Sequence, residues 1–351
     1  MRGEIVNGSP SFASKEVLRL AIPSDGELYE PTLSFLESCG LAVERPSQRR
    51  YTARLASVPA ALVLFQRTTD IALKVDEGNA DMGIVGLDRF LEFHREGGDA
   101  FVVIEDLGFG DCELVLAVPD TWVDVTSTHD LANLSVEMWE KGRELRVATR
   151  YPRLVQSFLF RRGISYFGMV QASGTLEAAP AMGFADVIAD ITSSGVTLRE
   201  NRLKTLEDGT ILSSKTCLVA NRRSLRDSPV RLSGARALLE RVEGRLSATE
   251  VVGVTGNVKG KTAEEVARHV LTRPELAGVQ GPTISPVFSR DGVSWHAVTV
   301  LVKEEKVLEA VEHLRLMGAN GITVGQPQYL FQEECAAYRR LVAAIEGRAG
   351  A

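Results

Sequence analysis

Short apolar runs of strand length alternate with segments of helical periodicity at the start of the chain. The strand-like runs are "LRLAIP" (18–23), "ALVLFQ" (61–66), "ADMGIVG" (80–86) and "AFVVIEDLG" (100–108). The helix-like segments are "LYEPTLSFLESCG" (28–40) and "LDRFLEFHREGG" (87–98), both closed by glycine. This alternation predicts an α/β architecture with largely parallel strands.

A second block of the same kind follows the apolar run "CELVLAVP" (112–119). It contains the helical pattern "LANLSVEMWEKG" (131–142), the strand pattern "LRVATR" (145–150) and the helical pattern "PRLVQSFLFRRG" (152–163). Two such blocks predict two lobes with a cleft between them, and ligand sites favour such boundaries.

The last hundred residues change rhythm. Strand and helix patterns follow one another in the order βαββαβ, at 250–258, 261–271, 283–290, 294–302, 304–318 and 321–327. This order predicts a ferredoxin-like unit. We interpret it as an appended binding or regulatory module, and His296, inside its third strand, as a structural residue.

The length and the net charge of the chain limit the kinds of function that it can have. A chain of 351 residues is long for one core and predicts two or three domains. The net charge of −6 and the pI of about 5.6 argue against a general nucleic-acid binder. An anionic ligand must therefore be met by local positive charge, by backbone amides or by a metal ion.

The cysteines and the N-terminal segment bear on the compartment. Cys39, Cys112, Cys217 and Cys335 are widely spaced and form no CxxC, which favours reduced thiols over disulfides or a zinc site. Residues 1–17 have no apolar core of a secretory signal, so we expect a disordered lead. No apolar stretch reaches the length of a membrane span. We expect a cytoplasmic protein that binds neither membranes nor nucleic acid.

Two near-matches to phosphate motifs fail. "GNVKGKT" (256–262) has only three residues between Gly256 and Gly260 where a Walker loop needs four, so we interpret Thr262 as a helix N-cap with Glu265 at N3. "GFGDCE" (108–113) lacks the third glycine of a dinucleotide fingerprint and leads into a strand. The histidines have no metal spacing, and no GxSxG elbow supports a hydrolase triad.

One loop carries more chemistry than a plain turn requires. "DITSSGVTLREN" (190–201) follows the apolar run "FADVIAD" and gathers four small hydroxyls around Gly195. Glu177, Asp186 and Asp190 are close in sequence. Hydroxyl and amide donors suit a phosphate, while carboxylates suit ribose hydroxyls or Mg²⁺, so a sugar phosphate accounts for both. A capping turn is the alternative, because Ser, Thr and Gly favour turns.

This stretch resembles the phosphoribosyl-diphosphate (PRPP) loop of ATP phosphoribosyltransferases, in which an Asp precedes Ser/Thr-Gly-x-Thr-Leu; here the pattern runs from Asp190 to Leu198. Further motifs of that family occur in the same order along the chain. They are "FQRTTDI" (65–71), "ADMGIVGLD" (80–88), "GFGDCELVLAVP" (108–119), "EAAPAMGFAD" (177–186), "LAGVQGPTISPV" (276–287) and "LRLMGANGITV" (314–324). The resemblance extends from about Leu18 to Phe331 and is to the long, plant-like form.

The resemblance implies a two-lobed catalytic unit of the periplasmic-binding-protein type (type II) and a C-terminal ACT-like domain that binds histidine as feedback inhibitor. We expect the chain to enter the second lobe near Pro119 and to return near Thr210. The implied parts are lobe I (18–118, with the return segment 210–246), lobe II (119–209), a regulatory domain (247–331) and a C-terminal helix or tail (332–351). The family also suggests dimers that associate into hexamers.

The implied reaction is attack of the adenine N1 of ATP on C1′ of PRPP, with Mg²⁺ assisting the departure of pyrophosphate. The implied PRPP-binding residues are Thr192, Ser193, Ser194, Gly195, Val196 and Thr197. The implied catalytic acids, facing the ribose hydroxyls or Mg²⁺–pyrophosphate, are Asp190, Asp186 and Glu177. The implied ATP-binding residues are Gly26, Arg67 and Asp88, and those for histidine are Asn257, Thr283 and Gly321. For Arg67 an ion pair with Asp70 is the structural alternative.

The first loop departs from the family pattern. Relatives often carry Pro-Ser-Lys-Gly-Arg, whereas "PSDGEL" puts Asp25 and Glu27 where Lys and Arg would stand. Acids facing a triphosphate repel it unless a metal ion intervenes. We hypothesise that Arg49, Arg50 and Arg54 hold the phosphates; Mg²⁺ in the loop and weakened ATP binding are the alternatives.

Two other function classes stay open. One is a cytosolic sensor of histidine or nucleotide that keeps the fold but has lost catalysis, which the acidic first loop supports. The other is a solute-binding protein with the same fold, which the missing export signal and the intact PRPP loop oppose.

Overall fold

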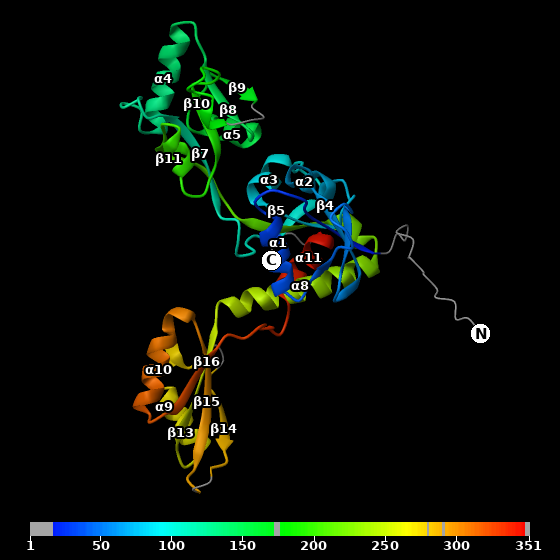
Figure 1. The fold of residues 1–351 in the computed structure, drawn as a ribbon, viewed down its shortest axis with the longest axis vertical. Helices are drawn as coiled ribbons and strands as arrows, with labels where there is room; N and C mark the ends of the chain where they lie inside the picture. The colour runs from blue at the N-terminus through cyan, green and yellow to red at the C-terminus, as the bar shows by residue number, and fades with distance from the viewer. Residues whose placement is uncertain (1–16, 172–175, 279–280, 290–291, 348–351) are drawn as a thin grey trace, which may run out of the picture. The chain divides into compact units, whose positions relative to one another are not determined.

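The computed structural model describes residues 17–171, 176–278, 281–289 and 292–347 (Figure 1). The expected lead thus lies outside the described residues, except for residue 17. The chain divides into two compact units. Unit 1 comprises Met1–Glu37, Ala42–Ala235 and Arg340–Ala351, and unit 2 comprises Ser38–Leu41 and Arg236–Arg339. Among the described helices, none combines the length and apolar character needed to cross a membrane.

Unit 1 contains two sheets, and the first, in lobe I, has seven strands. In their order across the sheet these are β2 (Val43–Glu44), β3 (Thr52–Leu55), β4 (Val58–Gln66), β1 (Leu18–Pro23), β5 (Met82–Gly86), β12 (Thr216–Asn221) and β6 (Ala100–Ile104). Its helices are α1 (Tyr29–Ser38), α2 (Thr68–Asp76), α3 (Leu87–Phe93) and α7 (Arg222–Arg226). Apolar residues of α2 and α3, among them Ile71, Val75 and Phe90, pack on Val85 and Val219 to form a core.

The second sheet, in lobe II, has five strands. In their order across the sheet these are β11 (Leu203–Ser214), β7 (Cys112–Pro119), β10 (Val187–Thr192), β8 (Leu145–Thr149) and β9 (Phe167–Gln171). Its helices are α4 (Thr128–Glu140), α5 (Pro152–Arg161), the 3-10 turn η1 (Leu176–Ala178) and α6 (Val196–Glu200). Buried Tyr151, Phe158 and Leu159 pack against Leu116 and Val147 of the sheet.

The two sheets repeat one plan. In lobe I the order β4-β1-β5-β12-β6 places a single antiparallel strand, β12, between parallel neighbours. In lobe II the order β9-β8-β10-β7-β11 does the same with β7. In each sheet the inserted strand is the one that follows a crossing of the chain. This arrangement confirms the expected two-lobed α/β unit of the periplasmic-binding-protein type.

The predicted crossing points are wrong by several residues. From Cys112 to Pro119 β7 pairs with β11, with irregularities in the register, and Glu113–Ala117 also pair with β10, so the chain has entered lobe II by Cys112 and not near Pro119. It leaves after Ser214, because β11 still pairs with β7 at that residue and Thr216 already pairs with β5. Lobe II therefore takes residues 112–214, where the sequence predicted 119–209.

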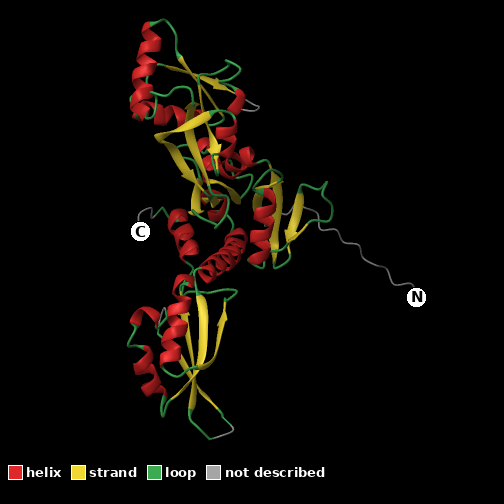
Figure 2. Cartoon of the chain, turned by 60° about the vertical axis from the view of Figure 1, so that its left-hand side comes forward, coloured by secondary structure: helices red, strands yellow, loops and turns green. Residues whose placement is uncertain are grey.

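Unit 2 contains a four-stranded sheet in the order β14 (Thr283–Val287), β15 (Trp295–Val302), β13 (Val252–Lys259) and β16 (Asn320–Gly325). Helices α9 (Ala263–Val270) and α10 (Val307–Leu316) lie on one side of it (Figure 2), and η2 (Pro274–Leu276) and η3 (Glu304–Lys306) are short turns. The predicted βαββαβ order is confirmed. So is the N-cap of α9, where the Thr262 hydroxyl accepts a hydrogen bond from the Glu265 N–H at 3.2 Å.

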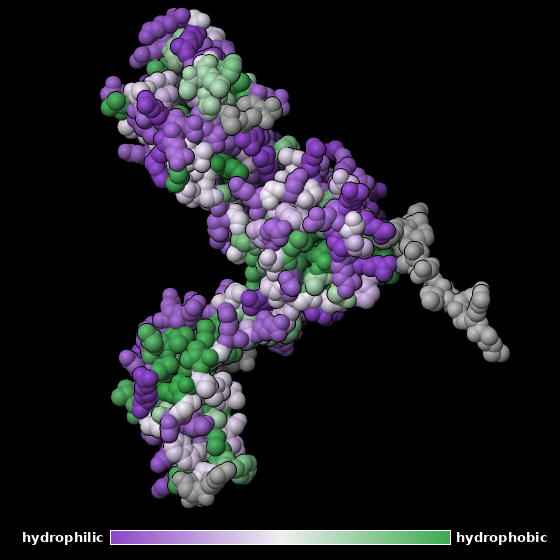
Figure 3. Space-filling model, in the orientation of Figure 1, coloured by the Kyte–Doolittle hydropathy of each residue, from purple (hydrophilic) through white to green (hydrophobic). Residues whose placement is uncertain are grey.

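Two helices cross the boundaries of the units in sequence. The helix α8 (Pro229–Thr249) runs through residue 236, and α11 (Ala336–Ile345) runs through residue 340. The main segment of unit 2 thus begins inside α8, at residue 236, whereas the sequence predicted a regulatory domain that begins at residue 247. Unit 2 also exposes large apolar side chains, including Leu308 and Leu316 of α10 and Val324 of β16, and Figure 3 shows an apolar area on its surface.

Candidate active site

Side chains of the expected site follow the carboxyl ends of parallel strands in both lobes of unit 1. In lobe I, Gly26 follows β1, Arg67 follows β4 and Asp88 follows β5. In lobe II, Ser193 follows β10, and Arg150, which was not among the expected residues, follows β8. The carboxyl ends of strands in open α/β sheets are where ligands bind, because the loops there converge.

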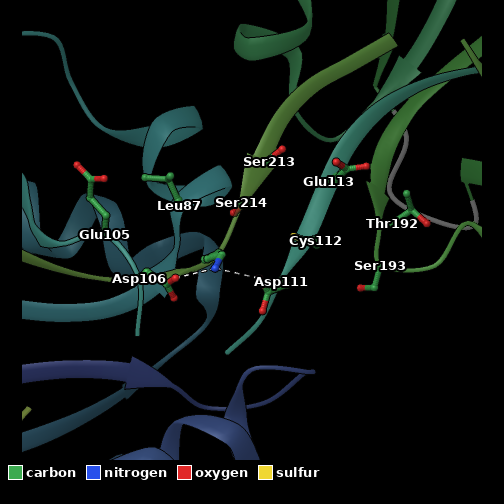
Figure 4. A pocket seen from close by; sticks show the side chains of 11 residues that line it. Leu87, Glu105, Asp106, Asp111, Cys112, Glu113, Thr192, Ser193, Ser213 and Ser214 are labelled. Carbon is green, nitrogen blue, oxygen red and sulfur yellow. Dashed lines mark hydrogen bonds and ion pairs between the residues drawn. The ribbon is translucent and has the colours of Figure 1, made fainter. Parts of the chain in front are cut away.

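A cavity of about 530 Å³ lies beside the ends of β5 and β10, where Leu87 and Ser193 line it (Figure 4). Leu87 and Asp106 line it from lobe I, Thr192, Ser193, Ser213 and Ser214 from lobe II, and Lys215 from the connection between them. It therefore brings the start of the hydroxyl-rich loop to face lobe I within the same unit.

The lining of the cavity is acidic around one cation. Glu105, Asp106, Asp111 and Glu113 contribute carboxylates, and Lys215 Nζ lies 2.6 Å from Asp106 Oδ2 and 3.4 Å from Asp111 Oδ1. Hydrogen bonds to these two carboxylates raise the pKa of Lys215. A polyanion here needs a metal ion or another source of positive charge.

Cys112 also lines the cavity, and its raised pKa disfavours the thiolate that a nucleophile needs. Burial, together with the charge of Asp88, raises the pKa of Cys112 to about 11, so the thiol stays protonated at neutral pH. The charge of Glu27 in the first loop also raises the pKa of this thiol.

The loop that resembles a phosphate cradle has a defined local structure. Thr192 Oγ1 accepts a hydrogen bond from the Gly195 N–H at 2.8 Å. Gly195 has φ of +68°, which only glycine adopts without strain, and α6 begins at the next residue. Leu198 is buried and anchors the short helix, whereas Ser193, Ser194 and Thr197 are exposed. The small side chains therefore stay available to a ligand.

Asp190 lies buried two residues before this loop. Its Oδ2 is 3.7 Å from Arg150 Nη2, and its Oδ1 accepts a hydrogen bond from the Ile191 N–H at 2.9 Å. Burial raises the pKa of Asp190 and outweighs the charge of Arg150, and nearby Glu177 raises it further. The structure thus brings Asp190, Glu177 and the loop together, as the sequence predicted, and adds Arg150, which the sequence analysis missed.

Asp186 does not belong to this group, and the prediction for it is wrong. It precedes β10, at the opposite end of the strand from Thr192, and it stands four positions before Asp190, about 13 Å along an extended chain. Its carboxylate accepts hydrogen bonds from the backbone N–H and side chain of Arg146 and from Arg143. Burial alone raises the pKa of Asp186, but these partners outweigh it and hold the pKa below its usual value. Asp186 is a structural anion.

Asp88 is buried in a network between the lobes. The Tyr151 hydroxyl donates to Asp88 Oδ2 at 2.6 Å, and the Ser214 hydroxyl donates to Oδ1 at 2.9 Å. The Arg89 guanidinium stacks over the Tyr151 ring at 4.3 Å. Burial and the Asp88 carboxylate raise the pKa of Tyr151, so its hydroxyl remains a donor. Asp88 is therefore already engaged and serves to position the lobes.

A second contact joins α3 of lobe I to the start of α5 of lobe II, where Tyr151 also lies. Glu92 of α3 accepts hydrogen bonds from the N–H groups of Arg153 and Leu154 at 2.9 and 3.0 Å, which caps the first turn of α5 from the other lobe. The sequence analysis missed Tyr151, Arg89 and Glu92. The one available signal was "TRYP", which puts a cation and an aromatic directly after a strand end.

The first loop and its basic neighbours meet at one edge of lobe I. The Ser24 N–H donates to the Gln66 carbonyl, and the Phe65 N–H donates to the Tyr51 carbonyl, so residues 24–27 and 45–51 both lie at the carboxyl end of β4. Asp25, Gly26 and Glu27 are exposed, and Gly26 has φ of +77°.

The basic segment is held in place by Arg45. Its guanidinium lies 3.9 Å over the Phe65 ring and donates to the carbonyls of Gln48 and Arg50 at 2.5 and 2.8 Å. Arg49 and Arg50 are exposed beside it. Arg67 is exposed too, and within the described residues it makes no ion pair with Asp70.

The three residues expected to contact histidine lie in the sheet of unit 2. Thr283 is aligned with Thr299, and Asn257 is aligned with Ala297 and Asn320. Gly321 is exposed in β16 with φ of +63°, at an irregularity of the register. Among the described residues no cluster of three or more His, Cys, Asp or Glu could hold a metal ion.

Comparisons with known proteins bear on the whole chain. Residues 67–244 match the family model described as ATP phosphoribosyltransferase, and residues 248–326 match the one described as the HisG C-terminal domain. ATP phosphoribosyltransferase 2, chloroplastic, of Arabidopsis thaliana is 40% identical over 96% of this chain and 84% of its own length. ATP phosphoribosyltransferase 1, chloroplastic, of the same plant is 38% identical over 93% of this chain and 81% of its own length.

A shorter relative and a solved structure match part of the chain. An ATP phosphoribosyltransferase of Brucella melitensis is 44% identical over 58% of this chain and 90% of its own length. The solved chain is from the ATP phosphoribosyl transferase (HisG:HisZ) complex of Thermotoga maritima, with 26% identity and a TM-score of 0.49 over 64% of this chain and 96% of that one.

Proposed function

We propose that this chain, which belongs to the ATP phosphoribosyltransferase family, catalyses that family's reaction, the first step of histidine biosynthesis. The adenine N1 of ATP attacks C1′ of PRPP; the new N–C bond forms as the bond to pyrophosphate breaks. The observation that carries the proposal is the loop 192–197, held open by the Thr192–Gly195 hydrogen bond beside buried Asp190.

The cradle binds the 5′-phosphate of PRPP through the hydroxyls of Ser193, Ser194 and Thr197 and the N–H groups around Gly195. Small exposed donors in a glycine turn suit a phosphate. Asp190 accepts hydrogen bonds from the ribose hydroxyls, with Glu177 adding negative charge beside it. Because these groups are fixed before the substrate arrives, they orient C1′ towards the nucleotide.

A divalent cation fits this site only as a partner of the substrate. Asp190 and Glu177 provide oxygen ligands, but Arg150 already balances Asp190, and the described chain offers no closed cage of carboxylates. Mg²⁺ prefers to keep waters and to take one or two carboxylates plus substrate phosphates. When bound, it supplies charge that stabilises the departing pyrophosphate.

ATP lies on the lobe I side, near Gly26 and Arg67. The acidic lining of the cavity and the exposed Asp25 and Glu27 repel its phosphates, so these are directed to Arg49 and Arg50, with Arg54 on the adjoining strand. The fixed conformation of residues 45–50 around Arg45 supports this placement. Alanine at Arg49, Arg50 and Arg54 should raise the KM for ATP and leave that for PRPP near its normal value; an unchanged KM for ATP would refute this placement.

Histidine is proposed to bind unit 2 at Asn257, Thr283 and Gly321 and to inhibit the enzyme. We also propose dimers that associate into hexamers. The exposed Leu308 and Leu316 support association through unit 2, because apolar side chains gathered on a surface mark interaction sites. The proposed compartment is the cytoplasm, although two similar proteins are named chloroplastic.

A second candidate is a sensor of histidine that no longer turns over substrate, which the acidic first loop favours. Mixing purified protein with ATP, PRPP and Mg²⁺ separates the two. The enzyme forms phosphoribosyl-ATP, read from its absorbance, and histidine slows the reaction. A sensor gains thermal stability with histidine and forms no product.

A further inference from the structure

We propose that Arg199 is a further PRPP-binding residue, whose guanidinium holds the 5′-phosphate in the cradle. This assignment rests on the proposed function and deepens it. The hydroxyls and N–H groups of residues 192–197 are neutral donors, whereas a phosphate monoester carries nearly two negative charges. In a protein of net charge −6, a cation at the cradle is the missing element.

The position of the Arg199 side chain supports the assignment. Arg199 lies on α6, and its backbone N–H donates to the Gly195 carbonyl at 3.2 Å. The guanidinium folds back over the loop: Arg199 Nη1 lies 3.0 Å from the position that the Cβ of a side chain at residue 195 would occupy. A Cβ at residue 195 would therefore be in tight contact with the guanidinium, which would have to move by a few tenths of an ångström. Gly195 is required by the left-handed backbone, and the guanidinium lies close against it.

The charge of Arg199 is available. Its guanidinium makes no hydrogen bond or ion pair with any other residue that the structure describes, and the residue is exposed. Arg150, which follows β8, lies 3.7 Å from Asp190 and balances that buried carboxylate. The two arginines thus have different roles: Arg150 balances the charge of Asp190, which faces the ribose, and Arg199 binds the phosphate. A planar guanidinium binds phosphate oxygens in pairs, with charge-assisted hydrogen bonds.

The test compares Arg199→Gln with a matched control, Arg161→Gln. Arg161 is an exposed arginine at the end of α5 in the same lobe, so both changes remove one positive charge. We expect Arg199→Gln to raise the KM for PRPP about 10- to 100-fold, since hydrogen bonds to charged groups contribute at this level. The KM for ATP should stay within about twofold, Arg199→Lys should recover part of the loss, and Arg161→Gln should behave like the wild type.

Two probes decide which phosphate is bound. Ribose 5-phosphate has the 5′-phosphate without the pyrophosphate, and inorganic pyrophosphate represents the other end. Arg199→Gln should weaken binding of ribose 5-phosphate, measured by titration calorimetry, and leave that of pyrophosphate unchanged. A loss confined to pyrophosphate would overturn the assignment, as would a KM for PRPP equal to that of the control. An inactive wild type that binds ribose 5-phosphate through Arg199 would refute the proposed function and keep the inference.

Discussion

Replacing Tyr151 with phenylalanine removes one buried hydroxyl and keeps the ring. The hydroxyl donates to Asp88 Oδ2 at 2.6 Å, and both residues are buried, with Tyr151 0% and Asp88 5% exposed. Phenylalanine fills the same space, and Arg89 can still stack on the ring. The substitution therefore isolates the hydrogen bond that joins lobe II to the Asp88 carboxylate.

The structure sets the size of the effect. A hydrogen bond to a charged group contributes about 1.5–3 kcal/mol, and Asp88 keeps the Ser214 hydroxyl at 2.9 Å, so we expect a loss of about 2 kcal/mol. For a unit of this size that corresponds to about 4–8 °C in the melting temperature of unit 1. The KM values for both substrates should rise together, because the hydrogen bond fixes the lobes that carry them.

The assay is thermal unfolding together with steady-state kinetics, and Tyr166→Phe is the control. Tyr166 is 38% exposed, so the loss of its hydroxyl should change stability by less than about 0.5 kcal/mol. A cycle with Asp88→Asn should give a coupling of about 1 kcal/mol or more between residues 88 and 151. Equal melting temperatures for Tyr151→Phe and Tyr166→Phe, or no coupling in the cycle, would refute this reasoning.

The remaining predictions concern the cradle and its acids. Gly195→Ala should cost about 1–2 kcal/mol because alanine is strained at φ of +68°, and should weaken PRPP binding because the strain alters the loop that carries the donors; equal PRPP protection in thermal unfolding would contradict it. Asp190→Asn should abolish most activity yet stabilise the protein at neutral pH. The raised pKa of Asp190 means that its contribution to stability is present below about pH 4 and is lost as the pH rises, so the gain should vanish in urea unfolding at pH 3. Asp186→Asn should do the opposite. The lowered pKa of Asp186 gives stability above about pH 4 that is lost as the pH falls, so the variant should be less stable than the wild type at pH 7 and approach it at pH 3, with PRPP binding unchanged.

Local periodicity was sufficient to predict most elements of the fold. The α/β alternation, the βαββαβ unit and the N-cap at Thr262 depend on neighbours within a few residues, which the sequence displays directly. The lobe boundary depends on pairing instead. Pro119 ends an apolar run, so the sequence predicted a lobe boundary there. The strand β7 before it pairs with β10 and β11 of lobe II, so the boundary lies before Cys112.

Only those site residues that lie close together in the sequence could be predicted. The cradle and Asp190 are contiguous, so the pattern found them. Tyr151 meets Asp88 across 63 residues of sequence, and Ser214 meets it across 126, so no local pattern could pair them. The prediction that Asp186 lies beside Asp190 failed for the converse reason. Residues a few positions apart along an extended strand are far apart in space, because the strand rises about 3.3 Å per residue.

The most direct test of the proposed reaction is product formation by the wild-type protein. Purified chain is mixed with ATP, PRPP and Mg²⁺, and phosphoribosyl-ATP is followed by absorbance while pyrophosphate release is measured in parallel. We predict one pyrophosphate per phosphoribosyl-ATP, with a rate that falls when histidine is added. Folded protein that binds PRPP or histidine and forms no phosphoribosyl-ATP would contradict the proposal and favour the sensor.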